Sequence, residues 1–450
     1  MPSDALFGPS LSTDVMLVTV SDRAWVQAML DVEAALARAE SRVGLVPASA
    51  ADGIASHCRV DDFDVAQLGR AAVRSANPVI PLLNALRAAV PREAAPYLHR
   101  GATSQDVLDT AMMLIARRGL DLILADLELA AASAATLADR HRATVMAART
   151  LLQQALPTTF GLKAAGWLIA IVEGRSELIR VRRTRLAVQF GGAAGTMAAL
   201  SDRGLDVARE LAGELALAEP TLPWHTARAR VVEVATALGI AAGVAGKVAL
   251  DVALLAQTEV GEISERAVAG RGTSSTLPHK HNPVDAIEIL AAVRGINAQI
   301  AVLQGAMVQE HERAAGAWQA EWPALAETLR LAGGAVFRLG SLLAGLQVDP
   351  DRMRRNLDLT GGRIMAEHVV MMLGERVDRV MARVVVDAAV ASATSTGRPL
   401  KDVLSEDPAV TAHLNAAELA VALDPAGYLG VAGLLIDRAL GAYRAQRGEG

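Results

Sequence analysis

The sequence predicts an all-α protein in which a central bundle of long helices joins a small N-terminal and a small C-terminal helical domain. Apolar residues recur every three or four positions over long stretches, whereas the alternating pattern of β-strands is nearly absent. Hydrophobic residues make up 52% and charged residues 21% of the 450 residues, which is typical of a globular chain with a large core. Aromatic residues make up only 3%.

The first clear helix lies in the segment DRAWVQAMLDVEAALARAES. Its apolar residues have the spacing of one helical face: Trp25, Met29, Val32 and Leu36. We expect this helix to end before Gly44 and Pro47.

The longest helical pattern covers residues 230–264 and contains no proline. At 1.5 Å per residue, such a helix would be roughly 50 Å long. Its apolar stripe is too long to be buried within one domain, so we expect it to bundle with other long helices, including copies from other subunits. Gly239, Gly243 and Gly246 would let neighbouring helices approach closely. Further helices are expected in residues 105–145, 161–188, 284–310 and 361–395.

Two breaks in the helical pattern divide the chain, one near residues 99–106 and one near residues 347–362. They predict an N-terminal helical domain at 1–104, a central long-helix domain at 105–350 and a C-terminal helical domain at 351–450.

Composition excludes several classes of function. A net charge of −5 provides no basic surface of the kind that nucleic acid requires. Cys58 is the only cysteine, so neither an internal disulfide nor a thiolate cluster can form, which fits a cytoplasmic location. The N-terminus lacks the apolar run of a signal peptide. Lys247 and Asp251 lie near the centre of the most apolar stretch, which favours a buried helix over a membrane span.

Helical periodicity leaves four polar segments unexplained: HRGATSQD (99–106), RTLLQQALPTTFG (149–161), QFGGAAGT (189–196) and RGTSSTLPHKHNPVDAIEI (271–289). Each by itself is typical of an ordinary loop. The last segment combines the N–H groups around Gly272 and Thr273, the hydroxyls of two serines, an ammonium and an amide. Such donors can hold a carboxylate while negative charge grows on it, and a hydroxyl among them can transfer a proton at carbon. A phosphate loop is excluded by the glycine spacing, and metal binding by His279 and His281 is weakly indicated.

TSSTLPHKHNP resembles the signature loop of the fumarase/aspartase superfamily, with Thr273 where glycine is common and Leu277 where methionine is. TSQD (103–106) and PTTFG (157–161) resemble two further segments of that superfamily. The resemblance implies an all-α homotetramer with a shared central bundle and active sites built from three subunits. It also implies bond formation or cleavage β to a carboxylate without a metal or an organic cofactor.

Two residues that lyases of the superfamily usually carry are missing. The histidine of an RTHxQ segment is replaced by Leu151, and the glutamate expected seven residues after Lys280 is replaced by Ile287. Because both partners of the pair are replaced together by apolar residues, we expect a different chemistry rather than loss of activity. Glu288 lies one position out of register, which turns it by about 100° on a helix, so we expect a structural role for it.

The chain is most similar to the cycloisomerase branch of the superfamily, which acts in protocatechuate breakdown, in LDVEAALARAESRVGLVP, HRGATSQDVLDTAM, LQQALPTTFGLKAAGW and QEHERAAGAWQAEW. This branch closes a muconate tricarboxylate into a γ-lactone. The nucleophile is already an ionised carboxylate, so no water or amine has to be activated. The enzyme must fold the diene acid, stabilise an enediolate and supply one proton.

The resemblance assigns proton transfer to Ser274, with Lys280 as electrostatic stabiliser or alternative acid. Carboxylate binding is expected from Thr103, Ser104, Gln154, Ser275 and Asn282. Arg313 and His99 are candidates for the remaining charges of the trianion. The alternative for Arg313 is a surface ion pair with Glu310 or Glu312, and that for His99 is a capping or buried role.

Two other functions stay open. LPHKHNP is similar to the loop of adenylosuccinate-type lyases, but such an enzyme needs an acid for a leaving nitrogen, and Leu151 cannot provide one. A non-catalytic helical scaffold is disfavoured by the presence of Ser274, Lys280 and Asn282.

Overall fold

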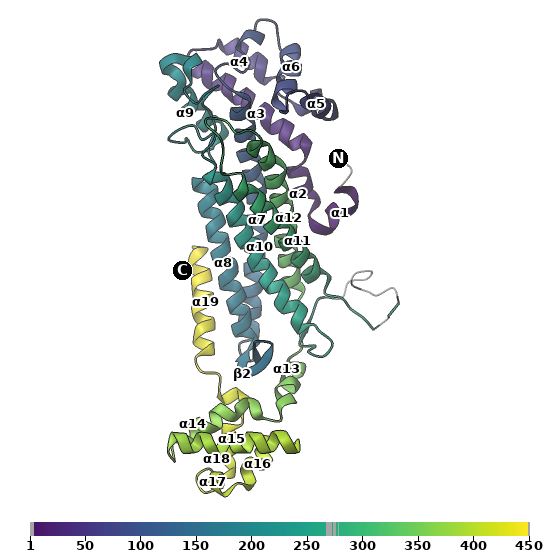
Figure 1. The fold of residues 1–450 in the computed structure, drawn as a ribbon, viewed down its shortest axis with the longest axis vertical. Helices are drawn as coiled ribbons and strands as arrows, with labels where there is room; N and C mark the ends of the chain where they lie inside the picture. Colours follow the sequence, from purple (N-terminus) through teal and green to yellow (C-terminus); the bar gives the residue numbers. More distant parts are fainter. Residues whose placement is uncertain (1–3, 267–271, 273–275, 278, 449–450) are drawn as a thin grey trace. The chain divides into compact units, whose positions relative to one another are not determined.

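The structure is a computed structural model that describes residues 4–266, 272, 276–277 and 279–448. Figure 1 shows the fold as a ribbon coloured along the sequence. The chain divides into two compact units. Unit 1 comprises residues 1–128, 173–247 and 287–339, and unit 2 comprises residues 129–172, 248–286 and 340–450. The divisions fall inside or beside long helices, so both units are built from segments far apart in the sequence.

The N-terminal part of unit 1 is a cluster of helices around α3 (Asp22–Arg42). The others are α1 (Asp4–Leu11), α2 (Asp14–Thr19), α4 (Ala48–Ala55), α5 (Val65–Ala72) and α6 (Val79–Ala89), with α9 (Gly204–Leu215) packed on α3. The helix predicted in this region is confirmed. It begins where the Ser21 hydroxyl accepts a hydrogen bond from the Ala24 N–H, because a serine at this position satisfies an N–H that has no partner within the helix.

Four long helices confirm predicted helical segments: α7 (Ser104–Arg140), α8 (Phe160–Thr184), α10 (Ala229–Leu255) and α11 (Val284–Gly305). A further long helix, α12 (Ala317–Gly345), lies in the expected central domain, where no separate helix was predicted. Within unit 1, α10 and α11 pack closely where Gly239 faces Ile300 and Gly246 faces Val293, as predicted for these two glycines. A Cβ at Gly243, the third glycine of the prediction, would meet no described atom within 4 Å. A Cβ at Gly246 would lie 3.1 Å from the Val293 side chain.

The prediction of one helix over residues 230–264 was wrong at its C-terminal end. The helix stops at Leu255, and the chain turns through Gly261, whose φ of +61° favours glycine. Glu262 then enters the interior of unit 2, where its carboxylate pairs with Arg149 at 2.6 Å. A buried ion pair therefore outweighs the local helical pattern.

The prediction that residues 149–161 form a loop was also wrong. Strands β1 (Val145–Thr150) and β2 (Gln153–Thr159) form an antiparallel hairpin in unit 2. The hairpin also explains why α7 ends at Arg140 rather than near residue 145. Another short pairing joins β3 (Ile263–Ser264) to β4 (Gln347–Val348).

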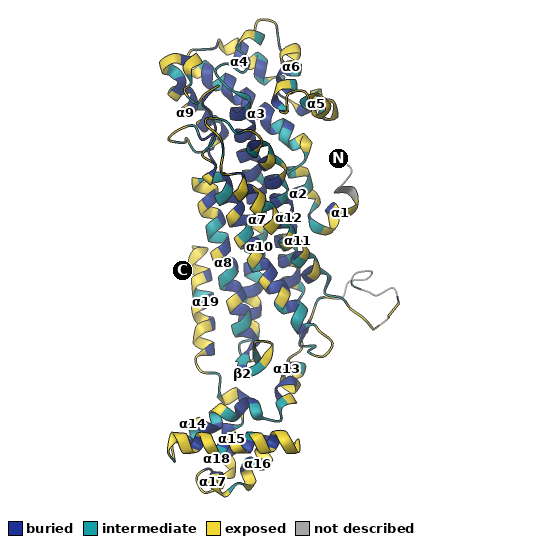
Figure 2. Ribbon diagram, in the orientation of Figure 1, coloured by how far each residue is buried: buried dark blue, intermediate teal, exposed yellow. Residues whose placement is uncertain are grey.

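The C-terminal part of unit 2 is helical. It contains α13 (Pro350–Leu357), α14 (Ala366–Gly374), α15 (Arg379–Thr396), α16 (Leu400–Glu406), α17 (Pro408–Thr411), α18 (Ala416–Ala422) and α19 (Ala432–Gln446). The predicted helix over 361–395 is broken before Asp378, whose side chain caps α15 by accepting from the Val380 and Met381 N–H groups. Exposed residues run along α15 and α19 (Figure 2).

Helices α10 and α11 are long and apolar enough to cross a bilayer by length and composition alone. Half of the apolar window of α10 is nevertheless buried within the protein. The Asp251 carboxylate in that helix accepts a hydrogen bond from Trp167 Nε1 at 2.7 Å. Burial and an internal partner for a charged group are typical of a core helix.

Candidate active site

The N-terminus of α7 is the centre of the candidate site in unit 1. The Thr103 carbonyl accepts from the Asp106 N–H, and the Thr103 N–H donates to Asp106 Oδ2 at 2.9 Å, so Thr103 and Asp106 begin the helix together. Ser104 is the first helical residue, and its hydroxyl accepts from Asn77 Nδ2 at 2.7 Å. Both predicted carboxylate-binding residues are half-buried at the positive end of a 37-residue helix, where an anion is stabilised.

The glycine-rich segment 189–196 packs directly on this helix start. The Gly192 N–H donates to Asp106 Oδ2 at 2.9 Å. Gly192 has a φ of +69°, and a Cβ there would lie 2.8 Å from the Gly101 carbonyl oxygen. Glycine is therefore required where the HRGATSQD and QFGGAAGT segments meet.

A buried histidine that the sequence did not single out completes the support of Asp106. His225 Nε2 lies 2.7 Å from Asp106 Oδ1, and both side chains are almost fully buried. The His225 carbonyl accepts from Gln105 Nε2 at 2.8 Å. In the sequence, His225 stands out only as a polar residue next to Trp224, in a segment without helical periodicity.

Arg313 joins the same site. Its Nη1 donates to Gln105 Oε1 at 3.0 Å, and its Nη2 donates to the Ala193 carbonyl at 2.8 Å. The alternative interpretation, an ion pair with Glu310 or Glu312, is absent from the described residues. Glu310 instead accepts from the Ala315 N–H. Arg313 is thus held by neutral acceptors, and its charge is not compensated by these carboxylates.

A buried charge network lies beneath Gln105. Arg228 is fully buried and donates to Asp109 at 2.7 and 3.0 Å and to Glu321 at 3.0 Å. Gln105 Nε2 donates to Asp109 Oδ2 at 3.1 Å, which fixes the amide so that Oε1 faces Arg313. Burial raises the pKa of Glu321, and the Arg228 charge opposes this shift.

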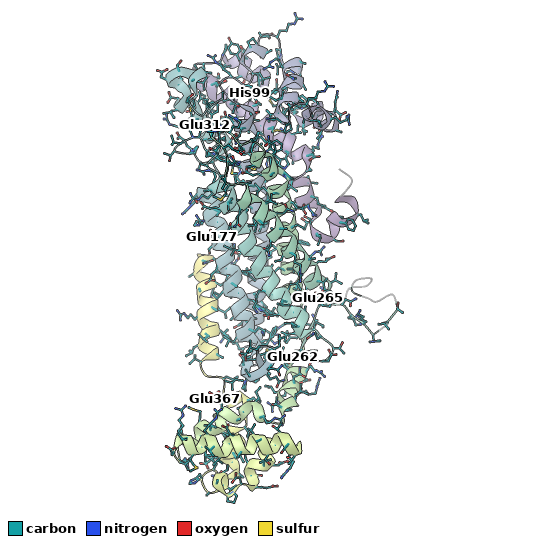
Figure 3. The ribbon with its side chains drawn as sticks, viewed as in Figure 1. His99, Glu177, Glu262, Glu265, Glu312 and Glu367 are labelled. Carbon is teal, nitrogen blue, oxygen red and sulfur yellow. The ribbon has the colours of Figure 1, made fainter. Side chains whose placement is uncertain are left out.

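His99 is the first residue of the HRGATSQD segment and is labelled in Figure 3. Its φ is +61°. Its Nδ1 is 2.7 Å from Oε1 of Glu33, a residue of α3 that is 1% exposed. One signal in the sequence could have found Glu33. It lies four positions after Met29 and three before Leu36, so an acidic residue falls on the apolar face of the helix, and it is buried in α3.

Unit 2 contains the other predicted residues. Ser274 and Ser275 lie outside the described residues. Lys280 is exposed, and its N–H donates to the Leu277 carbonyl. The Asn282 N–H donates to the Gly272 carbonyl at 2.9 Å, and Asn282 lines a cavity of about 440 Å³ together with Glu265, His281 and Ser341.

Gln154 lies on β2, and its Nε2 donates to the Asn356 carbonyl at 2.8 Å. Its Oε1 is buried without a hydrogen-bond partner among the described residues. The tip of the hairpin is formed by Leu151 and Leu152, which are 96% and 76% exposed and have φ values of +50° and +65°. Glu288 forms an ion pair with Arg338 at 2.9 Å, which fits the structural role expected for it.

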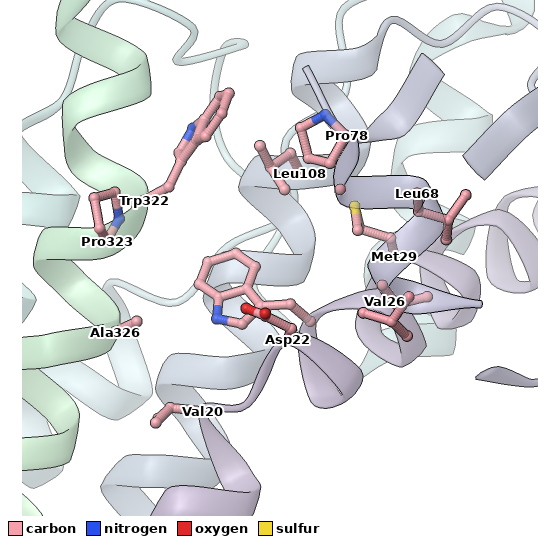
Figure 4. Close-up of a pocket in the computed structure, with 13 residues that line it drawn as sticks. Val20, Asp22, Val26, Met29, Leu68, Pro78, Leu108, Trp322, Pro323 and Ala326 are labelled. Atoms are coloured by element: carbon pink, nitrogen blue, oxygen red, sulfur yellow. The ribbon is translucent and has the colours of Figure 1, made fainter. Parts of the chain in front are cut away.

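An apolar cavity of about 330 Å³ in unit 1 does not suit a polyanionic ligand (Figure 4). Its walls include Trp25, Met29, Leu108 and Trp322, and the charged residue among its lining residues is the acidic Asp22. A tricarboxylate would be repelled by this carboxylate and would find no cation there. No group of three or more possible metal ligands is present in the described part of the chain.

Comparison with known proteins gives consistent matches over the whole chain. A family model described as "Lyase" matches residues 10–301, and one described as "Adenylosuccinate lyase C-terminus" matches residues 362–439. The chain is 48% identical over 438 residues to a 3-carboxy-cis,cis-muconate cycloisomerase of Bradyrhizobium diazoefficiens, with 97% of each chain covered. It is also 48% identical over 447 residues to a nitrosuccinate lyase of Streptomyces davaonensis, with 97% of this chain and 94% of that protein covered.

A solved structure gives the same result. The 3-carboxy-cis,cis-muconate lactonizing enzyme of Pseudomonas putida matches with a TM-score of 0.93 at 42% sequence identity, over 98% of this chain and 99% of that chain. The fold is therefore of the fumarase/aspartase type predicted from the signature loop.

Proposed function

Because the chain belongs to the lyase family of the fumarase/aspartase type, we propose that it catalyses the cyclisation of 3-carboxy-cis,cis-muconate to 4-carboxymuconolactone. The observation that carries the proposal is the 48% identity over 97% of both chains to a cycloisomerase of that specificity. The joint replacement by Leu151 and Ile287 supports it, because ring closure needs no activated external nucleophile.

In the proposed reaction, a carboxylate oxygen of the substrate attacks the diene carbon that bears the third carboxylate. The electron pair of the broken double bond moves toward the neighbouring carboxylate and forms an enediolate. A proton from the enzyme then adds to the carbon that lies between the attacked carbon and this carboxylate, which completes the lactone. We assign delivery of this proton to Ser274 and stabilisation of the enediolate to Lys280. The alternative is that Lys280 itself delivers the proton.

Carboxylate binding is assigned to Thr103, Ser104, His99 and Arg313 in unit 1 and to Gln154, Ser275 and Asn282 in unit 2. In unit 1, the N–H groups at the start of α7 and the Arg313 guanidinium provide donors for carboxylates, and Gln105 connects them. Arg313 has no ion pair among the described residues. A trianion needs such donors because desolvating each carboxylate without a partner costs several kcal/mol.

We propose that the active form is a cytoplasmic homotetramer with domains at 1–104, 105–350 and 351–450. Exposed apolar side chains on the long helices support self-assembly. Only 28% of the apolar window of α11 is buried within the chain, and the exposed side chains on α10 to α12 include Ile240, Ile287, Val302 and Phe337. Exposed apolar side chains on long helices are stabilised when another copy of the chain covers them.

Elimination from nitrosuccinate is the second candidate, because a nitrosuccinate lyase is equally similar in identity. That reaction would expel nitrite from a dicarboxylate and form a double bond, whereas the cyclisation consumes one. The adenylosuccinate alternative has less support, because the matching C-terminal model covers only residues 362–439, where none of the predicted site residues lies.

Incubation of the purified protein with 3-carboxymuconate and, separately, with nitrosuccinate distinguishes the candidates. The proposal expects loss of the diene absorbance and formation of the lactone, with no nitrite released at a comparable rate. Ser274→Ala and Lys280→Met should each lower turnover by orders of magnitude while the helical circular dichroism is unchanged. Near-wild-type rates in both variants would contradict the assigned roles, and nitrite release without diene loss would replace the function.

A further inference from the structure

His99 carries one hydrogen bond and leaves one nitrogen available. Its Nδ1 lies 2.7 Å from Glu33 Oε1, and 15% of the imidazole side chain is exposed. Among the described residues, His99 Nε2 has no hydrogen-bond partner. Glu33 is 1% exposed, and its second oxygen, Oε2, is buried with no partner in the described part of the chain. Among the described residues, the Glu33 carboxylate therefore forms its hydrogen bond with His99.

The backbone of His99 has a strained conformation. Its φ of +61° is unfavourable for a residue with a side chain. Leu98, which precedes it, is buried, and Gly101, two residues later, has a φ of +70°. The strained turn brings the imidazole to Glu33, although the two residues are 66 positions apart in the sequence.

Charged groups from three helices act on the imidazole. Burial lowers the pKa of His99, but the charge and hydrogen bond of Glu33 on α3 and the charge of Asp106 on α7 outweigh burial, while Arg87 on α6 opposes them. The net effect raises the pKa of His99 above its ordinary value. The cation of His99 therefore persists to higher pH than that of an ordinary histidine.

We propose that Glu33 is a positioning residue that holds His99 as a cation, with Nδ1–H donated to Glu33 and Nε2–H presented to a carboxylate of the substrate. This inference rests on the proposed function in that the substrate is a polycarboxylate. A neutral imidazole with its proton on Nδ1 would present the Nε2 lone pair and repel a carboxylate. Only the cation can donate from both nitrogens, so Glu33 determines whether His99 can bind the anion.

Binding of an unreactive tricarboxylate, propane-1,2,3-tricarboxylate, tests this by calorimetry between pH 6 and 9. Glu33→Gln retains the shape and an acceptor oxygen but removes the charge, so we expect roughly tenfold weaker binding near pH 7.5, with the loss of affinity beginning at lower pH than in the wild type. Glu33→Asp retains the charge and should restore most of the affinity. Glu40→Gln is the matched control, because Glu40 is equally buried on α3 but has no hydrogen bond to His99. It should bind as the wild type does.

His99→Asn separates positioning from a general effect on the fold, because asparagine tolerates a positive φ. In the His99→Asn background, Glu33→Gln should change the affinity no further. An additional tenfold loss there, or equal losses in Glu33→Gln and Glu40→Gln, would overturn the inference. If Glu33→Gln does not fold, the wild type and Glu33→Asp must show a pH dependence that His99→Asn lacks. Failure of the wild type to bind the probe also contradicts the inference, whereas failure to convert 3-carboxymuconate alone contradicts only the proposed function.

Discussion

Replacement of Arg228 by methionine tests the buried network that supports Gln105. Arg228 is fully buried between Asp109 and Glu321, and its guanidinium donates to both carboxylates at 2.5 to 3.1 Å. Methionine fills a similar volume but leaves two buried carboxylates without their cation. Removing one partner of a buried ion pair typically costs about 3 to 5 kcal/mol, since the remaining charge is uncompensated. We expect Arg228→Met to lower the thermal midpoint by roughly 10 °C.

The pH dependence of this loss follows from protonation of Glu321. Burial already raises the pKa of Glu321, and loss of the Arg228 charge should raise it further. A carboxyl whose pKa is higher in the folded state binds more protons when folded, so its contribution to stability falls as pH rises through the folded pKa. The deficit of Arg228→Met should therefore be largest near pH 8 and smaller near pH 5.

Scanning calorimetry at pH 5, 6.5 and 8 measures both effects. Arg230→Met is the matched control on α10, because Arg230 is only partly buried and donates to the Arg185 carbonyl rather than to a carboxylate. It should lower stability by no more than about 1.5 kcal/mol. The reasoning is refuted if Arg228→Met costs less than about 1 kcal/mol, or if its cost is the same at pH 5 and pH 8.

Three further predictions concern single contacts. Burial raises the pKa of Glu40 to about 8, so Glu40→Gln should become more stable than the wild type as pH rises from 5 to 9, and parallel thermal midpoints across that range would contradict this. Leu151→Asn with Leu152→Gly should stabilise the hairpin turn by about 1 kcal/mol for each residue, because both positions have positive φ, and an unchanged urea midpoint would exclude strain there. Trp167→Phe removes the hydrogen bond to Asp251 and should cost about 1 to 3 kcal/mol, measured by urea denaturation; a cost below about 0.5 kcal/mol would mean that this bond contributes little.

Local patterns were sufficient for α3 and for four of the long helices. The i, i+3 and i, i+4 spacing of apolar residues predicted α3, α7, α8, α10 and α11, because helical hydrogen bonds and the buried face of a helix both depend on residues close in sequence. The signature loop predicted the superfamily, and the replacement by Leu151 and Ile287 predicted the branch that the cycloisomerase relatives support.

The departures from these predictions share a cause. The hairpin at residues 145–159 forms because two short segments pair with each other, and the early end of α10 places Glu262 against Arg149. Neither the hairpin nor the early end of α10 can be predicted from the spacing of apolar residues along the sequence. Long-range pairing can override local preference whenever a buried charge or backbone group needs a partner.

The sequence by itself determined α3 and four of the long helices, the superfamily and the types of residue available for carboxylate chemistry, since these depend on spacing and local composition. Only the tertiary structure decided which groups act on one another. It joined His99 to Glu33, Asp106 to His225 and Arg313 to Gln105, in pairs that are 66, 119 and 208 positions apart. Charges and hydrogen bonds act over a few ångströms in space, so a chain must fold before its ionisable groups acquire their partners.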